Sequence, residues 1–139
     1  PTDVPGELLT FSSSNPAAGA DLVFTIPDSS RFKVFGIRAT LTTVGINTPT
    51  AIFTIANATG TLFRFTAPLV HPAAAARTYN FIARHPVNDA TFNASGDILL
   101  SFPLLILTNA ATLTLSGQDA DDDWGVGLMY AEIFLEAQA

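Results

Sequence analysis

Hydrophobic and polar residues alternate with a period of two along most of this chain. Residues 35–42 give the clearest case, with apolar residues at the odd positions and polar or small residues at most of the even ones. Successive side chains of a β-strand point to opposite faces of its sheet, so the pattern predicts a half-buried strand. Its inner face is predicted to carry Phe35, Ile37, Ala39 and Leu41.

Shorter runs of the same kind predict further strands along the whole chain. They lie at residues 8–11, 22–26, 51–56, 61–65, 78–83, 97–102, 112–116 and 128–136. Turn-forming residues such as Pro, Asn, Asp and Gly separate the runs, and the alanine-rich stretch 73–76 is too short for a stable helix. The sequence therefore predicts an all-β fold, an antiparallel and jelly-roll-like β-sandwich of about eight strands in two sheets.

The predicted strands form one continuous series. No Gly- or Ser-rich linker and no internal repeat divides it, and 139 residues is the size of one ordinary domain. Residues 8–139 are therefore expected to form a single β-sandwich domain. Residues 1–7 contain two Pro and a Gly and have little to bury, so we expect a flexible N-terminal arm that lies across a neighbouring subunit.

The composition is apolar for a soluble domain. Charged residues make up 13% of the chain, against roughly 25% in a typical domain, and the mean hydropathy is +0.37. Both faces of the predicted 51–56 strand carry apolar residues, including the face expected to meet solvent. Exposed apolar surface usually marks contact between proteins, so we expect a homo-oligomer or a lattice rather than a solitary monomer.

The charges are sorted by sign along the sequence. Residues 1–28 carry four acids and no base, residues 29–88 carry six bases and no acid, and residues 89–139 carry eight acids and no base. Either these segments balance one another inside one sandwich, or they meet between copies as complementary surfaces. The net charge of −6 argues against a basic face for phosphates, so no nucleic-acid partner is expected.

Three aspartates form a pattern that suggests a metal site. Asp119, Asp121 and Asp123 match the first, third and fifth positions of a calcium-binding loop. Trp124 then occupies the sixth position, where the loop needs Gly, and Tyr130 occupies the twelfth, where it needs Glu. A solvated acidic turn is therefore the preferred interpretation over a calcium site, and no cofactor is expected.

The sequence gives little support to enzyme chemistry. The chain has no Cys, and it contains neither a nucleophile elbow nor a phosphate-binding glycine loop. His71 and His85 lie in the basic middle segment, which contains no Asp or Glu, so we interpret them as loop histidines without a catalytic or zinc-binding role. Trp124 is interpreted as an anchor in the core or at an interface, with sugar stacking as the alternative. We expect no enzymatic activity.

No segment is expected to cross a membrane. The longest apolar stretch, 98–107, is interrupted by Ser101 and Pro103 and reaches about half the length that a bilayer requires. The first residues lack the basic and apolar regions of a secretory signal. Pro1 is also the kind of residue that remains after an initiator Met is removed, so synthesis in the cytoplasm is expected.

Four segments carry a recognisable order of features. They are a Pro-bounded strand pair (22–43), a hairpin (51–60), a Phe-Pro-Leu segment (102–115) and an acidic ending before a strand with Glu132 (121–136). This order resembles that of small β-sandwich virion structural proteins of tailed bacteriophages, the decoration and head-associated proteins. The resemblance covers most of residues 21–136 and rests on strands and turns, not on a catalytic motif.

The resemblance implies a non-enzymatic capsid decoration or cement subunit. Such a subunit assembles as a homo-oligomer, commonly a trimer, on the lattice of the major capsid protein, so its expected place is the exterior of the virion. A fibre base or adaptor subunit and a carbohydrate-binding jelly-roll module are the alternatives. The residues expected at interfaces are Arg31, Lys33, Arg38, Arg64, Arg77, Arg84, Trp124 and Glu132.

Overall fold

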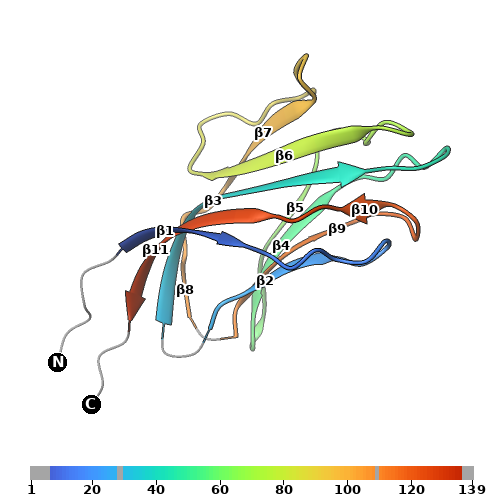
Figure 1. The fold of residues 1–139 in the computed structure, drawn as a ribbon. Coiled ribbons are helices and arrows are strands. Elements are labelled where there is room, and N and C mark those ends of the chain that lie inside the picture. The colour runs from blue at the N-terminus through green and yellow to red at the C-terminus, as the bar shows by residue number, and fades with distance from the viewer. Residues whose placement is uncertain (1–6, 28–29, 109, 136–139) are drawn as a thin grey trace.

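Two β-sheets pack face to face in the computed structural model, which describes residues 7–27, 30–108 and 110–135 (Figure 1). The seven-stranded sheet contains, in order, β1 (Glu7–Ser12), β11 (Leu128–Leu135), β3 (Ser30–Thr42), β6 (Ala76–Ala83) and β7 (Asp97–Phe102), with β8 (Ile106–Leu107) and β10 (Asp123–Trp124) added to β3. The four-stranded sheet contains β2 (Leu22–Thr25), β9 (Thr112–Ser116), β4 (Ile52–Asn57) and β5 (Gly60–Thr66), in that order. The predicted all-β sandwich is confirmed.

The strand order is that of a jelly roll. When β7, β8 and β10 are set aside, the eleven strands reduce to eight, in two sheets of four with the orders β1-β11-β3-β6 and β2-β9-β4-β5. The chain passes repeatedly from one sheet to the other, so residues distant in sequence become neighbours in each sheet. The pairings are antiparallel except between β6 and β7, which run parallel because the long connection at residues 84–96 carries the chain back along the sheet.

Aromatic side chains fill the space between the sheets. Phe53 of β4 has its ring centroid 4.6 Å from that of Phe81 on β6 and 5.5 Å from that of Phe102 on β7. All three side chains are buried, and they join the four-stranded sheet to the seven-stranded one. Alternate residues of β2, β4 and β9 face this core, as the period-two pattern predicted.

The inner face predicted for residues 35–42 is wrong at its first member. Ile37, Ala39 and Leu41 are buried, but Phe35 is half-buried and falls out of phase with them. In the pairing with β11, Gly36 lies opposite Tyr130 and Val34 lies opposite Ala131, so Phe35 is an extra residue on β3. This β-bulge shifts the alternation by one position, which a strict period of two cannot anticipate.

Each of the nine runs predicted as strands is a strand in the structure. The strands β8 and β10, each of two residues, were missed because such short pairings leave no periodic pattern. The predicted N-terminal arm covers residues 1–7; Glu7 begins β1, and residues 1–6 lie outside the described residues. Within the ranges that the structure describes, no helix has the length and hydrophobicity needed to cross a bilayer.

Candidate functional site

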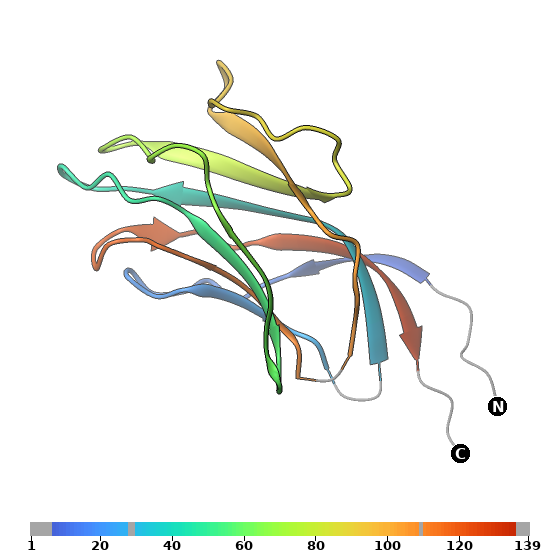
Figure 2. The same ribbon diagram turned by 180° about the vertical axis from the view of Figure 1, so that it is seen from behind.

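Three loops lie at one end of the sandwich, and the carboxylate of Asp122 joins two of them. The three are the β3–β4, β5–β6 and β9–β10 connections (residues 43–51, 67–75 and 117–122), which we call the loop end (Figure 2). The Oδ1 atom of Asp122 accepts hydrogen bonds from the backbone N–H of Val44 (3.1 Å) and the side-chain amide of Asn47 (3.0 Å). Its Oδ2 atom accepts a third from the backbone N–H of Asp119 (3.0 Å).

Asp122 is fully buried and nevertheless suited to remain an anion. Burial by itself would raise the pKa of this carboxyl, but the hydrogen bonds from Asn47, Asp119 and Val44 outweigh it, so the pKa is lowered overall. A buried carboxylate with three donors joins loops that are far apart in sequence. Asp122 is therefore a structural tie of the loop end.

The imidazole of His71 is buried next to the same loops. Its Nε2 lies 2.9 Å from the backbone carbonyl of Ala75, and its Nδ1 lies 2.9 Å from the hydroxyl of Tyr79. A carbonyl only accepts, so Nε2 carries the proton and Nδ1 accepts the hydroxyl hydrogen of Tyr79. Burial lowers the pKa of His71, which favours this neutral form.

This buried arrangement is suited to holding the loops, not to catalysis. Both ring nitrogens of His71 already have partners, and burial raises the pKa of Tyr79 well above its usual range, so its hydroxyl stays protonated. The hydroxyl of Thr43 donates to the carbonyl of Pro72 (2.7 Å) and accepts from the N–H of Ala75 (3.1 Å). These groups are bonded to one another.

The three aspartates of the calcium alternative do not form an ion site. Asp119, Asp121 and Asp123 are exposed, and Asp121 accepts a hydrogen bond from the Asn47 amide at 2.7 Å. In the described part of the chain, no three His, Cys, Asp or Glu side chains converge closely enough to hold a metal ion. The sequence analysis did not single out Asp122, the buried member of the run, because the sequence does not show which of several neighbouring aspartates is buried.

Trp124 lies in the core and not at an interface. The side chain is 0% exposed, its ring centroid is 5.7 Å from that of Tyr79, and its Nε1 donates to Oε1 of Gln118 at 2.8 Å. Its assignment as an interface candidate is therefore corrected, and so is the alternative of stacking on a sugar. Of the two anchor roles considered from sequence, the structure supports the one in the core.

The six basic residues are spread over both sheets. Arg31, Lys33 and Arg38 belong to β3, Arg64 to β5 and Arg77 to β6, and Arg84 follows β6. The Nζ atom of Lys33 lies 3.8 Å from Oε1 of Glu132, directly across the β3–β11 pairing. At this pair the middle and C-terminal charge segments balance each other within one chain, which is the first of the two interpretations of the charge sorting.

Apolar side chains are exposed at the loop end. Ile46 is 92% exposed in the β3–β4 connection, and Val44 beside it and Val70 in the β5–β6 connection are exposed as well. The backbone N–H of His71 donates to the carbonyl of Pro49 at 2.7 Å, which joins the two connections. We call Val44, Ile46 and Val70 the apolar tip. Hydrogen bonds of the buried Asp122 and His71 hold the loops from which the apolar tip projects.

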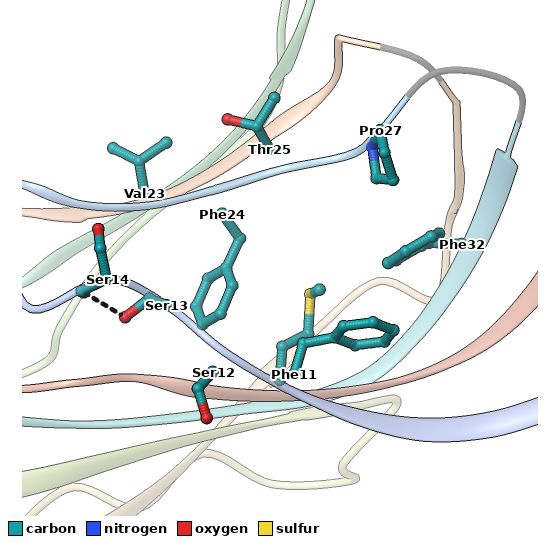
Figure 3. A pocket seen from close by; sticks show the side chains of 10 residues that line it. Phe11, Ser12, Ser13, Ser14, Val23, Phe24, Thr25, Pro27 and Phe32 are labelled. Carbon is teal, nitrogen blue, oxygen red and sulfur yellow. Dashed lines mark hydrogen bonds between the residues drawn. The ribbon is translucent and has the colours of Figure 1, made fainter.

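A second feature, an open pocket of about 320 Å³, lies between the edge strands β1 and β2 (Figure 3). Aromatic rings and small hydroxyls form its walls, and its lining contains no acid, base or histidine. The lining residues are Phe11, Ser12, Ser13, Ser14, Val23, Phe24, Thr25, Pro27, Phe32 and Met129. Such a lining suits apolar side chains or extended backbone and provides no group for acid–base chemistry.

No protein-family model and no curated protein matches this chain. Among solved structures, a chain in the structure of PfGH50B is similar to it, with 11% sequence identity and a TM-score of 0.38. That match covers 99% of this chain and 24% of the other. At this TM-score the likeness carries no argument about function.

Proposed function

We propose that this chain is a non-enzymatic virion structural protein, a decoration or cement subunit on the head of a tailed bacteriophage. It would assemble as a homo-oligomer, a trimer by the resemblance, and bind the lattice of the major capsid protein on the outside of the particle. The resemblance of its strands and turns to that group supports the proposal, and so do its low charge and apolar composition.

The apolar tip is the observation that carries the proposal. Large aliphatic side chains on a surface lose free energy when another protein covers them, by roughly 25 cal/mol per Å² of apolar area. Val44 and Ile46 project from the β3–β4 connection, which the buried Asp122 holds. The His71 N–H joins the connection of Val70 to it, so little conformational entropy is lost when a partner binds. A subunit repeated many times on a particle needs only a modest contact of this kind in each copy.

The alternatives have less support. A carbohydrate-binding module needs an exposed aromatic platform, and the residue considered for it from the sequence, Trp124, is buried. A hydrolase needs two carboxylates in a concave site, and the pocket between β1 and β2 is lined by none. A fibre base or adaptor subunit would use the same apolar surfaces, so it remains the closest alternative.

The test is binding to empty phage heads. Light scattering after size-exclusion chromatography gives the oligomeric state of the protein alone, and co-sedimentation with heads that lack decoration protein measures binding. Ile46→Lys is expected to fold normally and to lose most binding, because a charge replaces the most exposed side chain of the apolar tip. The matched control is Val87→Lys, an exposed valine in the β6–β7 connection, and it should bind normally. A monomer that ignores the heads would reject the assignment.

A further inference from the structure

The outer edges of two β-sheets are where strands can pair with another chain, and this molecule protects its edges unequally. The edge strand β7 is covered by its own preceding loop. The backbone N–H groups of Leu99 and Ser101 donate to the side chains of Asp89 (2.9 Å) and Asn88 (2.7 Å), and Asp97 N–H donates to Asn93 (3.0 Å). These bonds occupy the amides that a second strand would need.

The two edges of the four-stranded sheet are blunted in other ways. At one edge, β5 carries the charge of Arg64, and its pairing with β4 is irregular near Ile55 and Ala56. At the other edge, β2 has four residues, with Asp21 before it and Pro27 shortly after it. Charge, irregularity, shortness and Pro are the usual devices against edge pairing.

Among the described residues, the edge strand β1 has one of these devices, the acidic Glu7 at its first position. It runs for six residues to Ser12 without Pro, and its register against β11 is regular. The backbone N–H of Ser13 donates to the carbonyl of Gly127, which precedes β11. Amides alternate in direction along a strand, so the amide of every second residue of β1, counted back from Ser13, points toward β11. The amides of Leu8, Thr10 and Ser12 therefore face the open edge.

We propose that this edge binds a second copy of the same chain, through antiparallel pairing of the two β1 strands about a two-fold axis at Thr10. Thr10 of one copy then lies opposite Thr10 of the other, and Leu8 lies opposite Ser12. All three residues present edge-facing amides, so each facing pair exchanges two backbone hydrogen bonds. The two seven-stranded sheets become one continuous sheet.

The side-chain pattern also fits a second copy better than an unrelated strand. In this register Leu9 of each copy faces Phe11 of the other. Both residues lie on the inner side of the sheet, because each is paired with a buried residue of β11. Leu9 is 40% exposed in the single chain, and Phe11 lines the pocket between β1 and β2. The pairing covers both side chains.

This inference does not rest on the proposed function, because β1 and the apolar tip are separate surfaces. A two-fold contact cannot close a trimer, so it would link two trimers or form a dimer. The contact can be tested on the protein alone, in the absence of phage heads. If the β1 pairing does not occur, the decoration proposal is unaffected. If the protein does not bind phage heads, the β1 pairing is unaffected.

Cysteine cross-linking tests the register directly, because the natural chain contains no Cys. Facing residues of a hydrogen-bonded pair have Cα atoms about 5.5 Å apart, which suits a disulfide, whereas Ser12 of one copy would lie about 14 Å from Ser12 of the other. Thr10→Cys is therefore expected to form a covalent dimer at least ~10-fold faster than Ser12→Cys under mild oxidation. Equal rates for the two variants would overturn the proposed pairing.

A proline pair tests the edge without introducing a thiol. Thr10→Pro removes an amide that faces the open edge of β1, and Thr66→Pro removes one that faces the open edge of β5, since Ala67 N–H donates to the carbonyl of Ala51. Both leave the internal pairings intact. Light scattering should show loss of the two-fold assembly for Thr10→Pro and its retention for Thr66→Pro. An assembly that survives Thr10→Pro, or a wild-type protein with no two-fold species, would reject the inference.

Discussion

The carboxylate of Asp122 accepts a hydrogen bond from the backbone N–H of Val44, at 3.1 Å and across a separation of 78 residues. Val44 belongs to the apolar tip, so an exposed apolar surface is positioned by a buried anion. The link joins the β3–β4 connection to the β9–β10 connection, and neither loop has a helix or a disulfide to hold it. The junction of these two loops therefore depends on the ionisation and the donors of one side chain.

Asp122→Asn is expected to destabilise the fold. The amide is nearly the same size as the carboxylate, but its NH₂ group would face donors and its charge is lost, so we expect a loss of about 2–3 kcal/mol in the free energy of unfolding. Chemical denaturation measures this. The matched control is Asp121→Asn, which changes the exposed neighbour and should cost much less. Equal losses in the two variants would show that Asp122 is not the tie described here.

His71 makes stability depend on pH in a defined direction. Burial lowers its pKa, the hydrogen bond to Ala75 opposes this, the charge of Arg77 lowers the pKa further, and the charge of Asp122 again opposes it. The neutral ring is thus favoured in the folded chain. The unfolded chain binds the proton more tightly, so stability is present above pH 6.5 and is lost as pH falls below it.

The free energy of unfolding is expected to fall by at most about 1.4 kcal/mol for each pH unit below 6.5, until the pH reaches the pKa of His71 in the folded protein. Thermal unfolding across this range measures the slope in the wild type and in two variants. His71→Gln should flatten it, and His85→Gln, a change at a partly exposed histidine, should leave it in place. A slope that persists in His71→Gln would assign the effect to other groups.

Tyr79→Phe removes the hydroxyl that donates to Nδ1 of His71. A buried acceptor without its donor costs about 1–2 kcal/mol of stability. The O–H···N bond forms only with the neutral ring, so its removal should also raise the pKa of His71. An NMR titration of the imidazole gives that pKa. Tyr130→Phe serves as the control, because this exposed hydroxyl has no part in the network; an unchanged pKa in Tyr79→Phe would contradict the assignment of the protons.

The fold could be predicted largely from the sequence, because period-two alternation depends on burial of one face and most strands here bury one face. The runs at 22–26 and 112–116 show this plainly, and they pair with each other in the structure. The order of strands in each sheet comes from the structure alone. What the pattern cannot give is a local change of phase, and the bulge at Phe35 is such a change.

The loop end was harder to predict because its chemistry comes from contacts between distant segments. Asp122 looks like any member of an acidic run, and only Val44 and Asn47, which approach from another loop, distinguish it. His71 follows a valine and precedes a proline, which is typical of an exposed loop, yet Tyr79 and Ala75 enclose it. Trp124 stands next to four acidic positions and is nevertheless core.

Two glycines near the loop end give a final test of its geometry. Gly117 has φ +96°, and a Cβ atom there would collide with the backbone carbonyl oxygen of Thr50, which cannot move aside as a side chain can. Gly45 has φ +59°, and a Cβ atom there would meet nothing within 4 Å. The first position therefore combines an unfavourable conformation with a clash, whereas the second has the conformation alone.

Gly117→Ala is accordingly expected to cost about 3 kcal/mol or more of stability, because strain in the backbone and displacement of Thr50 add together. Gly45→Ala should cost only about 1 kcal/mol, since an alanine can adopt this left-handed conformation at that penalty. Urea denaturation of both variants measures the difference. If Gly45→Ala proved the more costly, the β3–β4 connection and not the approach of Gly117 to Thr50 would be the tightly constrained part of the loop end.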